Sequence, residues 1–192
     1  KQPDVVWMTY LDIDEIAEGA TEDVPVPRRV KASAVPGGSP SSKSGTVVHW
    51  GRCDRLDNRR PGTIHRKLKV GLGRAFRHFI WKGAVILVDG DSVVPIDPLF
   101  VRADSLTTGG VLEREWSCEV RDTMDPASPV GVVSVRFSSL PVLTWSRWSK
   151  AEKRQRGITN GAGVSIVRGG REVDYGWFFM GGKRRQNYDD WW

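Results

Sequence analysis

Apolar positions along the chain follow a helical period in one stretch and strand-like periods in several others. Between residues 63 and 82 apolar side chains recur at every fourth position, which is the spacing of a helix that buries one face. These positions are Ile64, Leu68, Leu72, Phe76 and Ile80. Thr63 is suited to cap the start of this helix and Gly83 to end it. The pattern therefore predicts one long amphipathic helix over residues 63–82.

Two glycines, Gly71 and Gly73, stand inside this predicted helix. Each weakens a helix by about 1 kcal/mol relative to alanine. Because glycine has no side chain, we expect the helix to cross close to a sheet or to another stretch of backbone.

Shorter apolar or alternating stretches predict β-strands. The expected strands lie at residues 4–11, 46–50, 84–88, 111–120 and 130–142, with a further hairpin within 164–179. Asp89-Gly90 and Gly169-Gly170 are suited to tight hairpin turns, because these residue types tolerate positive φ.

Two further stretches predict short helices. The acidic residues 12–23 favour one helical turn, with Ile13 and Ile16 facing inward. Residues 145–163 favour a short basic helix followed by a glycine-rich bend. Residues 24–45 are rich in Pro, Gly and Ser and are typical of a linker.

The order of these elements predicts an α+β fold, in which a mixed β-sheet carries the long crossover helix on one face. We assign residues 1–44 to a Pro/Gly-rich N-terminal linker or tail. Residues 45–192 are assigned to one α+β domain. The ends of the chain suggest that it is a piece of a longer protein.

The composition excludes some classes of protein. Hydrophobic residues make up 39% of the 192 residues and charged residues 27%, which is ordinary for a globular protein. A run of about 18 apolar residues is absent, so we expect no membrane partner and a cytoplasmic location. Because the chain is basic and shows no export signal, Cys53 and Cys118 are expected to be reduced thiols rather than a disulfide. The three histidines are scattered, which argues against a structural metal site.

The net charge of +6 is concentrated in clusters of basic residues. Arg66, Lys67, Arg74 and Arg77 occupy polar positions of the predicted helix, and form a candidate basic face. A second cluster, residues 183–185, comprises Lys183, Arg184 and Arg185 beside two glycines. These clusters leave open an alternative function, a basic nucleic-acid-binding α+β module. For the first cluster, an amphipathic helix that lies on a sheet is the commoner explanation.

The stretch RGGREVD, residues 168–174, flanks a tight turn with charged residues. Arg168 and Arg171 lie on either side of the turn, and Glu172 or Asp174 could pair with either arginine. One interpretation is a hairpin held by a salt bridge. The other is a pair of guanidinium groups that contact a carboxylate or phosphate elsewhere.

Motifs of common enzymes are absent from the chain. It contains no GxGxxG after a strand, no GxxxxGK[ST] loop and no GxSxG elbow. The histidines have no evident nucleophile partner. We therefore assign no catalytic, metal-binding or cofactor-binding residue in this chain.

Four stretches, taken in order, resemble a known family. They are GTVVHWGRCDRLD from Gly45, LGRAFRHFIWKGAVILVDGDSVVPIDPLF from Leu72, GAGVSIVRGGREVD from Gly161 and NYDDWW from Asn187. They are similar to prokaryotic members of the GHKL ATPase superfamily, which includes gyrase B, MutL, the ninety-kilodalton heat-shock chaperones and the MORC proteins. The similar region follows the ATP-binding domain and is called the transducer domain.

This resemblance implies a fold like the second domain of a ribosomal small-subunit protein. It also implies that the full-length protein is an ATPase that binds ATP and Mg²⁺ upstream of Lys1, because the ExxxN, DxGxG and GxxGxG motifs of that superfamily are absent here. Its phosphate-sensing lysine is expected beyond Trp192. The implied role is to couple ATP binding and hydrolysis to conformational change or dimerisation.

The partners implied by the resemblance are the missing ATPase domain and, as an open question, a second copy and nucleic acid. The candidate contacts with that domain or with phosphate are Arg168, Arg171, Glu172, Lys183, Arg184 and Arg185. By itself this chain is predicted to be inactive.

Overall fold

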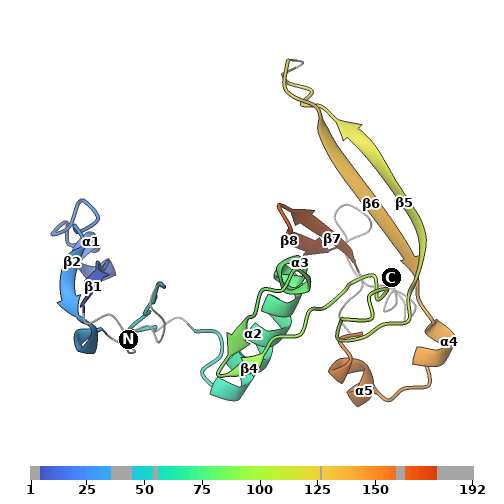
Figure 1. The fold of residues 1–192 in the computed structure, drawn as a ribbon, viewed down its shortest axis with the longest axis horizontal. Coiled ribbons are helices and arrows are strands. Elements are labelled where there is room, and N and C mark those ends of the chain that lie inside the picture. The colour runs from blue at the N-terminus through green and yellow to red at the C-terminus, as the bar shows by residue number, and fades with distance from the viewer. Residues whose placement is uncertain (1–4, 36–44, 54–55, 126, 159–162, 177–192) are drawn as a thin grey trace. The chain divides into compact units, whose positions relative to one another are not determined.

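The structure is a computed structural model that describes residues 5–35, 45–53, 56–125, 127–158 and 163–176. Its chain divides into two compact units, Lys1–Asp57 and Asn58–Trp192 (Figure 1). Both units combine helices with antiparallel strand pairs, so the protein belongs to the general α+β class. No helix in the described ranges has the length and apolar character needed to span a membrane.

The first unit is built on one strand pair. Strand β1 (Val5–Met8) pairs antiparallel with β2 (Arg28–Lys31), which lies inside the stretch expected to be a linker. A 3-10 turn, Ala32–Ala34, follows β2. The expected strand at residues 46–50 is wrong, because this segment has no strand partner and remains irregular.

The short helix α1 (Ile13–Ala17) forms where the sequence predicted a helical turn. The Asp12 carboxylate caps it by accepting a hydrogen bond from the Asp14 amide at 3.0 Å. The expectation that Ile13 and Ile16 face inward is wrong, since they are 81% and 48% exposed. A helix of five residues presents too small a surface to build a core, and none of its residues is buried.

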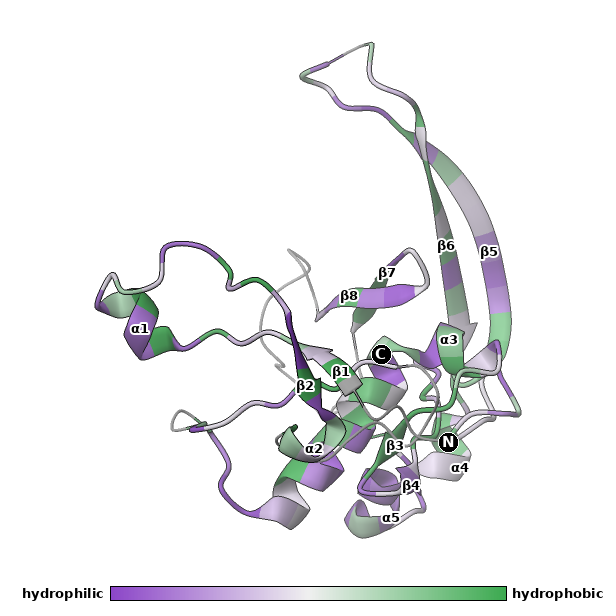
Figure 2. Ribbon diagram, turned by 60° about the vertical axis from the view of Figure 1, so that its left-hand side comes forward, coloured by the Kyte–Doolittle hydropathy of each residue, from purple (hydrophilic) through white to green (hydrophobic). Residues whose placement is uncertain are grey.

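The second unit contains the expected long helix as two segments, α2 (Pro61–Ala75) and α3 (Arg77–Trp81). Helix α2 begins earlier than predicted, with Pro61 in its first turn, where a missing amide proton costs nothing. Phe76, with φ −108° and ψ 15°, interrupts the helix, although its carbonyl still accepts a hydrogen bond from the Ile80 amide at 3.0 Å. Hydrophobic and hydrophilic residues share the surface of α2 (Figure 2).

A close backbone crossing explains one of the two glycines of α2. The Ile96 amide donates to the Gly73 carbonyl at 2.9 Å, and a Cβ at Gly73 would lie 2.3 Å from the Val94 carbonyl oxygen. A Cβ at Gly71 would meet nothing within 4 Å. The predicted crossing is therefore confirmed at Gly73, and Gly71 has no such role.

In the described residues of the second unit, six strands form three hairpins. They are β3 (Leu87–Val88) with β4 (Asp91–Ser92), β5 (Val111–Val120) with β6 (Gly131–Ser139), and β7 (Val164–Arg168) with β8 (Arg171–Gly176). The predicted turns are confirmed, with φ of 51° and 86° at Asp89 and Gly90, and of 59° and 79° at Gly169 and Gly170.

The predicted mixed sheet is wrong for the described residues, where every sheet is an antiparallel pair. The path of residues 93–96 gives the physical reason. The Val93 amide still pairs with the Ile86 carbonyl at 2.9 Å, but Ile96 then bonds to α2 through Gly73 instead of continuing a strand ladder. Helix α2 therefore packs against this segment and β8 rather than across a wide sheet.

Few apolar residues are buried in the described part of the second unit. Phe100, Trp145 and Ile158 form one cluster, with Leu140 and Trp148 packed against it, and Val88 and Val93 are buried separately, Val93 beside Gly73 of α2. The Phe100 and Trp145 rings meet edge-on with centroids 5.0 Å apart. Two short helices, α4 (Val142–Trp145) and α5 (Lys150–Gln155), replace the single helix expected from residue 145 onward.

Candidate functional site at the helix–hairpin junction

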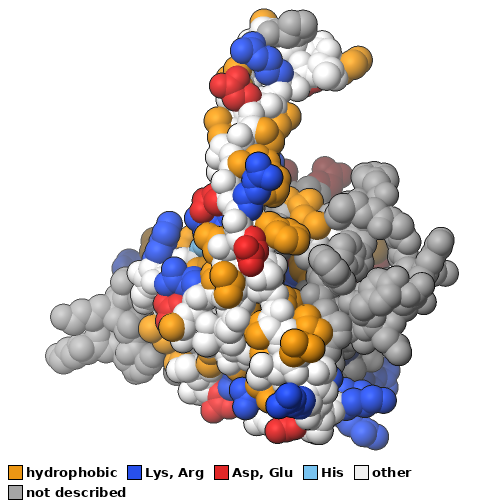
Figure 3. Space-filling model, turned by 90° about the vertical axis from the view of Figure 1, so that its right-hand side faces the viewer, with side chains coloured by type: hydrophobic (Ala, Val, Ile, Leu, Met, Phe, Trp, Pro, Cys, Tyr) orange, Lys and Arg blue, Asp and Glu red, His pale blue; other side chains and the backbone are white. Residues whose placement is uncertain are grey.

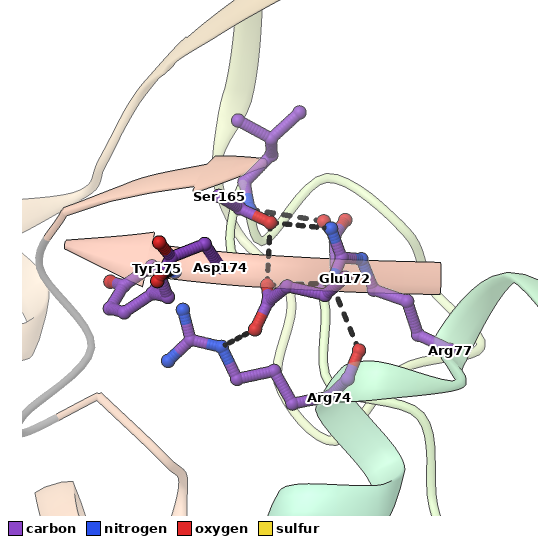
Figure 4. A network of polar contacts seen from close by, with 8 residues as sticks. Arg74, Arg77, Ser165, Glu172, Asp174 and Tyr175 are labelled. Atoms are coloured by element: carbon purple, nitrogen blue, oxygen red, sulfur yellow. Dashed lines mark hydrogen bonds and ion pairs between the residues drawn. The ribbon is translucent and has the colours of Figure 1, made fainter. Parts of the chain in front are cut away.

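The Glu172 carboxylate on β8 joins the hairpin β7–β8 to the long helix. Its Oε1 lies 2.6 Å from Arg74 Nε, and its Oε2 lies 2.9 Å from Arg77 Nη1 (Figure 4). The Glu172 side chain is 9% exposed and that of Arg77 is 4% exposed. We call this set of side chains, together with Ser165, the helix–hairpin junction.

Ser165 on β7 completes the hydrogen bonding of the junction. Its hydroxyl accepts from Arg77 Nη2 at 2.8 Å and donates to Glu172 Oε2 at 2.5 Å. Arg77 Nη1 also donates to the Arg74 carbonyl at 2.9 Å. The guanidinium of Arg77 is thus held by the end of α2 and by both strands of the hairpin.

The charge of the junction is positive, because two arginines share one carboxylate. The Arg74 contact with Glu172 is an ion pair without good hydrogen-bond alignment. The Arg74 guanidinium also lies over the Tyr175 ring, 3.0 Å from its centroid. A cation over an aromatic face gains electrostatic stabilisation, which offsets part of the free-energy cost of the excess positive charge.

These contacts correct the predicted roles of Arg74 and Arg77. Both were expected on a basic face of the helix, but they point into the junction instead, while Arg66 and Lys67 are exposed. The predicted salt bridge within the hairpin is also wrong, because Glu172 pairs with the helix and not with Arg168 or Arg171. Helical spacing alone cannot reveal a partner that lies 95 residues away.

Arg168 and Arg171 are opposite each other in the register of β7 and β8, at the tip of the hairpin. Both are exposed, and neither forms an ion pair with a residue of the described ranges. The Arg171 guanidinium lies 5.5 Å from the centre of the Phe76 ring. Like charges directly opposite in a strand pair are unfavourable. The exposed tip of the hairpin therefore carries two positive charges close together, those of Arg168 and Arg171. Lys183, Arg184 and Arg185 lie outside the described residues.

A second feature, around Asp97, holds the PIDPLF segment in place. The buried Asp97 carboxylate accepts hydrogen bonds from the amides of Leu99, Val101 and Arg102, each at 3.0 Å. Phe100, with φ of 55°, presents its carbonyl to the amides of Gly109 and Gly110. Asp97 thus has a structural role, as expected of a residue near a turn.

His65 ties the β3–β4 turn to helix α2, a contact that the sequence reading missed. Its Nδ1 lies 3.0 Å from Asp89 and its Nε2 lies 3.3 Å from Asp91, both to Oδ2 atoms. Lys69, one turn further along α2, lies 3.4 Å from the same Asp91 oxygen. The i, i+4 spacing of two basic residues opposite a D-G-D turn is the signal that could have revealed it.

His78 on α3 has an altered acidity. Burial lowers its pKa below the ordinary value of 6.5, and the positive charges of Arg77, Arg136 and Lys82 lower it further, against a raising effect of Asp97. The folded protein therefore favours the neutral imidazole more than the unfolded chain does.

The charged groups of the junction connect the helix to the hairpin. The Glu172 carboxylate, the Arg77 guanidinium and the Ser165 hydroxyl all bond to one another. The described residues include no group of three His, Cys, Asp or Glu side chains that could bind a metal. Comparisons of the chain with protein-family models, with curated proteins and with solved structures found no match.

Proposed function

We propose that this chain is the coupling module of a nucleotide-driven protein, a part that passes on the effect of ATP without binding ATP itself. One observation carries the proposal. The junction joins two of the stretches that resemble the GHKL ATPase superfamily, LGRAFRHF through Arg74 and Arg77, and SIVRGGREVD through Ser165 and Glu172. Residues of these two stretches are therefore in direct polar contact.

The physical character of the junction supports a mechanical role. An apolar contact can slide, whereas a buried carboxylate held by two guanidinium groups and a hydroxyl has one satisfactory arrangement. Displacement of the hairpin would leave charges of Arg77 and Glu172 buried and unpaired, which is costly. Helix and hairpin are thus expected to move as one body when a neighbouring domain pushes on either.

The proposal depends on this junction and not on a wide sheet, since the described residues form none. The residues of the junction do not fit ATP or Mg²⁺, because their charged atoms are already paired and no acidic cluster accompanies them. ATP and Mg²⁺ are therefore assigned to another part of the full-length protein, and no step of hydrolysis is assigned to this chain.

A nucleotide titration of the 192-residue chain tests whether ATP binds outside this chain, as we propose. With isothermal calorimetry and ATP·Mg²⁺ as the titrant, we expect no saturable heat and no release of phosphate. Saturable binding or turnover by this chain would show that it contains a nucleotide site of its own, and the coupling proposal would then be wrong.

The tip arginines provide the test of coupling. In the protein that joins this chain to an ATP-binding domain, Arg171→Glu should change the rate of ATP hydrolysis several-fold, because it reverses a charge at the exposed hairpin tip. Arg66→Glu, an exposed charge reversal on α2, is the matched control and should leave the rate unchanged. Equal rates in the parent and both variants, with equal thermal stability, would exclude a role of the tip in coupling.

The alternative function, nucleic-acid binding, has lost part of its support. Arg74 and Arg77 are occupied by Glu172, so the basic face of α2 retains only Arg66 and Lys67 of the four predicted residues. Retention of the chain on immobilised DNA, weakening steeply between low and moderate salt, would favour this alternative, because phosphate contacts release counterions.

A further inference from the structure

The tip of the hairpin β7–β8 presents two guanidinium groups from one small area. Arg168 and Arg171 are joined by the turn Gly169-Gly170, whose φ angles of 59° and 79° are typical of a tight hairpin turn. Side chains directly opposite in an antiparallel pair share a face, with Cβ atoms about 4.5–5.5 Å apart. The positive charges of the two tip arginines are therefore presented on the same side of the hairpin.

The two acidic side chains of the same hairpin are engaged elsewhere. The Glu172 carboxylate is paired with two arginines of the helix. The Asp174 carboxylate accepts a hydrogen bond from the Tyr175 amide at 2.7 Å. Within the part of the chain that the structure describes, neither carboxylate forms an ion pair with a tip arginine. The hairpin thus does not neutralise its own tip.

Two other exposed arginines of the second unit have carboxylates beside them. Arg136 Nη2 lies 3.0 Å from Glu115 Oε1, and Arg102 Nη2 lies 2.7 Å from Asp104 Oδ2. On the hairpin β5–β6, acidic and basic side chains lie close together (Figure 3). At the tip of β7–β8 the corresponding carboxylates have to come from a partner.

The helix supports one side of this tip, and the other side is open. A Cβ at Gly170 would lie 3.6 Å from the Phe79 ring, so this half of the turn rests on α3. The Arg171 guanidinium lies 5.5 Å from the centre of the Phe76 ring, within the range of cation–π attraction. A Cβ at Gly169 would meet nothing within 4 Å. The tip is therefore supported from below and accessible from its Gly169 side.

We propose that the tip of β7–β8 binds a protein segment that carries two neighbouring carboxylates. A planar guanidinium group can hold a carboxylate through two parallel N–H···O bonds, and each tip arginine can hold one carboxylate in this way. Two such pairs balance the like charges that oppose each other in the hairpin. The inference rests on the proposed function, because the segment is assigned to the domain with which this chain is coupled.

The limited amount of charge favours a short acidic segment over a nucleic-acid strand. A strand repeats its phosphates and requires a track of basic residues. The side chains next to the tip on the helix are the rings of Phe76 and Phe79. Arg74 and Arg77, on the same helix, are already paired with Glu172. The positive charge that remains available there is that of the two tip arginines.

The contact is expected to be weak for a free peptide. Ion pairs at an exposed site contribute little, so we expect a dissociation constant of about 1 mM or weaker. A segment within the same protein has an effective concentration of about the millimolar range when the linker is short. The contact can therefore form between linked domains without a large interface.

A peptide titration of the 192-residue chain tests the ligand class. The probe is a short peptide with blocked ends and two adjacent glutamates, and its control has glutamines in their place. At low salt, the side-chain Nε–H signals of Arg168 and Arg171 in NMR spectra should shift saturably with the glutamate peptide. The glutamine peptide should not shift these signals, because it offers no charge.

Two double variants separate the tip from the overall charge of the chain. Arg168→Gln with Arg171→Gln removes two positive charges from the tip, and Arg66→Gln with Lys67→Gln removes two from the exposed surface of α2. Calorimetry with the glutamate peptide should give a loss of affinity of about tenfold or more for the tip variant, because charge-assisted pairs are lost. The α2 variant should lose less than about threefold, since its charges act only at long range.

Each result bears on the inference. Equal losses of affinity in the two variants, or no saturable shift at peptide concentrations well above the millimolar range, would overturn it. Tighter binding of a phosphoserine peptide or of a single-stranded oligonucleotide would overturn the assignment to carboxylates. The ATP titration separates this inference from the proposed function. Nucleotide binding by the chain would refute the coupling role and leave the peptide result standing, whereas failure of the peptide would leave the coupling role of the junction standing.

Discussion

The two glycines of α2 offer a prediction in which the same substitution has opposite signs. Gly71 and Gly73 are two residues apart, about 200° around a helix, so they lie on nearly opposite sides. Gly73 is buried against residues 93–96, and Gly71 is exposed. We expect Gly71→Ala to stabilise the protein and Gly73→Ala to destabilise it.

The magnitudes follow from the local geometry. Alanine in place of glycine in a helix interior gains about 1 kcal/mol, and at Gly71 a Cβ meets nothing within 4 Å, so this gain is fully available. At Gly73 the new Cβ would lie 2.3 Å from the Val94 carbonyl oxygen, closer than the 3.0 Å that Cβ contacts respect. The clashing atom is backbone and cannot rotate away.

Relief of the clash at Gly73 requires residues 93–96 to move off the helix. That movement strains the hydrogen bond from the Ile96 amide to the Gly73 carbonyl, worth about 0.5–1.5 kcal/mol. Overpacking itself costs about 1–3 kcal/mol. After subtraction of the alanine gain, Gly73→Ala should lose about 1–3 kcal/mol, and the two variants should differ by about 2–4 kcal/mol.

Urea unfolding followed by circular dichroism measures this difference. The midpoint of Gly71→Ala should lie above that of the parent chain and the midpoint of Gly73→Ala below it, with similar slopes. If the two variants had the same midpoint, the crossing of residues 93–96 over α2 would be misplaced.

Two other predictions concern charged groups of the second unit. Glu172→Gln should lower the free energy of unfolding by about 3–5 kcal/mol in urea melts, because it leaves the Arg74 and Arg77 charges without a counter-charge. The control Arg171→Gln, at the exposed tip, should change the free energy of unfolding little. Equal effects of the two substitutions would contradict the ion pairs of the junction. For His78, the lowered pKa means that the unfolded chain binds more protons than the folded one just below pH 6.5, so stability should fall as the pH drops through that region. His78→Gln should flatten this part of the stability curve, and an unchanged slope would argue against a lowered pKa of His78 in the folded protein.

Local patterns predicted the elements that depend on local contacts. Strand β5 has the predicted bounds, and both glycine-containing hairpin turns form, because alternation and turn residues act over a few positions. The long helix is right in position but is divided at Phe76. By contrast, the arrangement of strands was wrong, since pairing depends on contacts between distant residues that periodicity does not encode.

Arg77 shows how the junction could have been recognised. A polar residue on an amphipathic helix is normally taken as exposed, which is why Arg77 was placed on a basic face. However, Gly73 and Arg77 are four residues apart and therefore share one side of the helix. Once Gly73 is taken as the mark of a close crossing, the arginine on that side is expected to be buried, and a buried arginine requires an acidic partner.

The division between polar and apolar contacts in the second unit bears on its function. The apolar cluster around Phe100 and Trp145 contains no residue of α2, β7 or β8, and the helix contacts the hairpin through the charged groups of Arg74, Arg77 and Glu172. Such a connection adds little net stability, because desolvation of the charges offsets their attraction. It does fix one relative position, since every other position leaves a buried charge unpaired. A fixed position between a helix and an exposed, positively charged hairpin tip is what a part that transmits motion requires. This is why the coupling role that we propose is assigned to the junction rather than to the core.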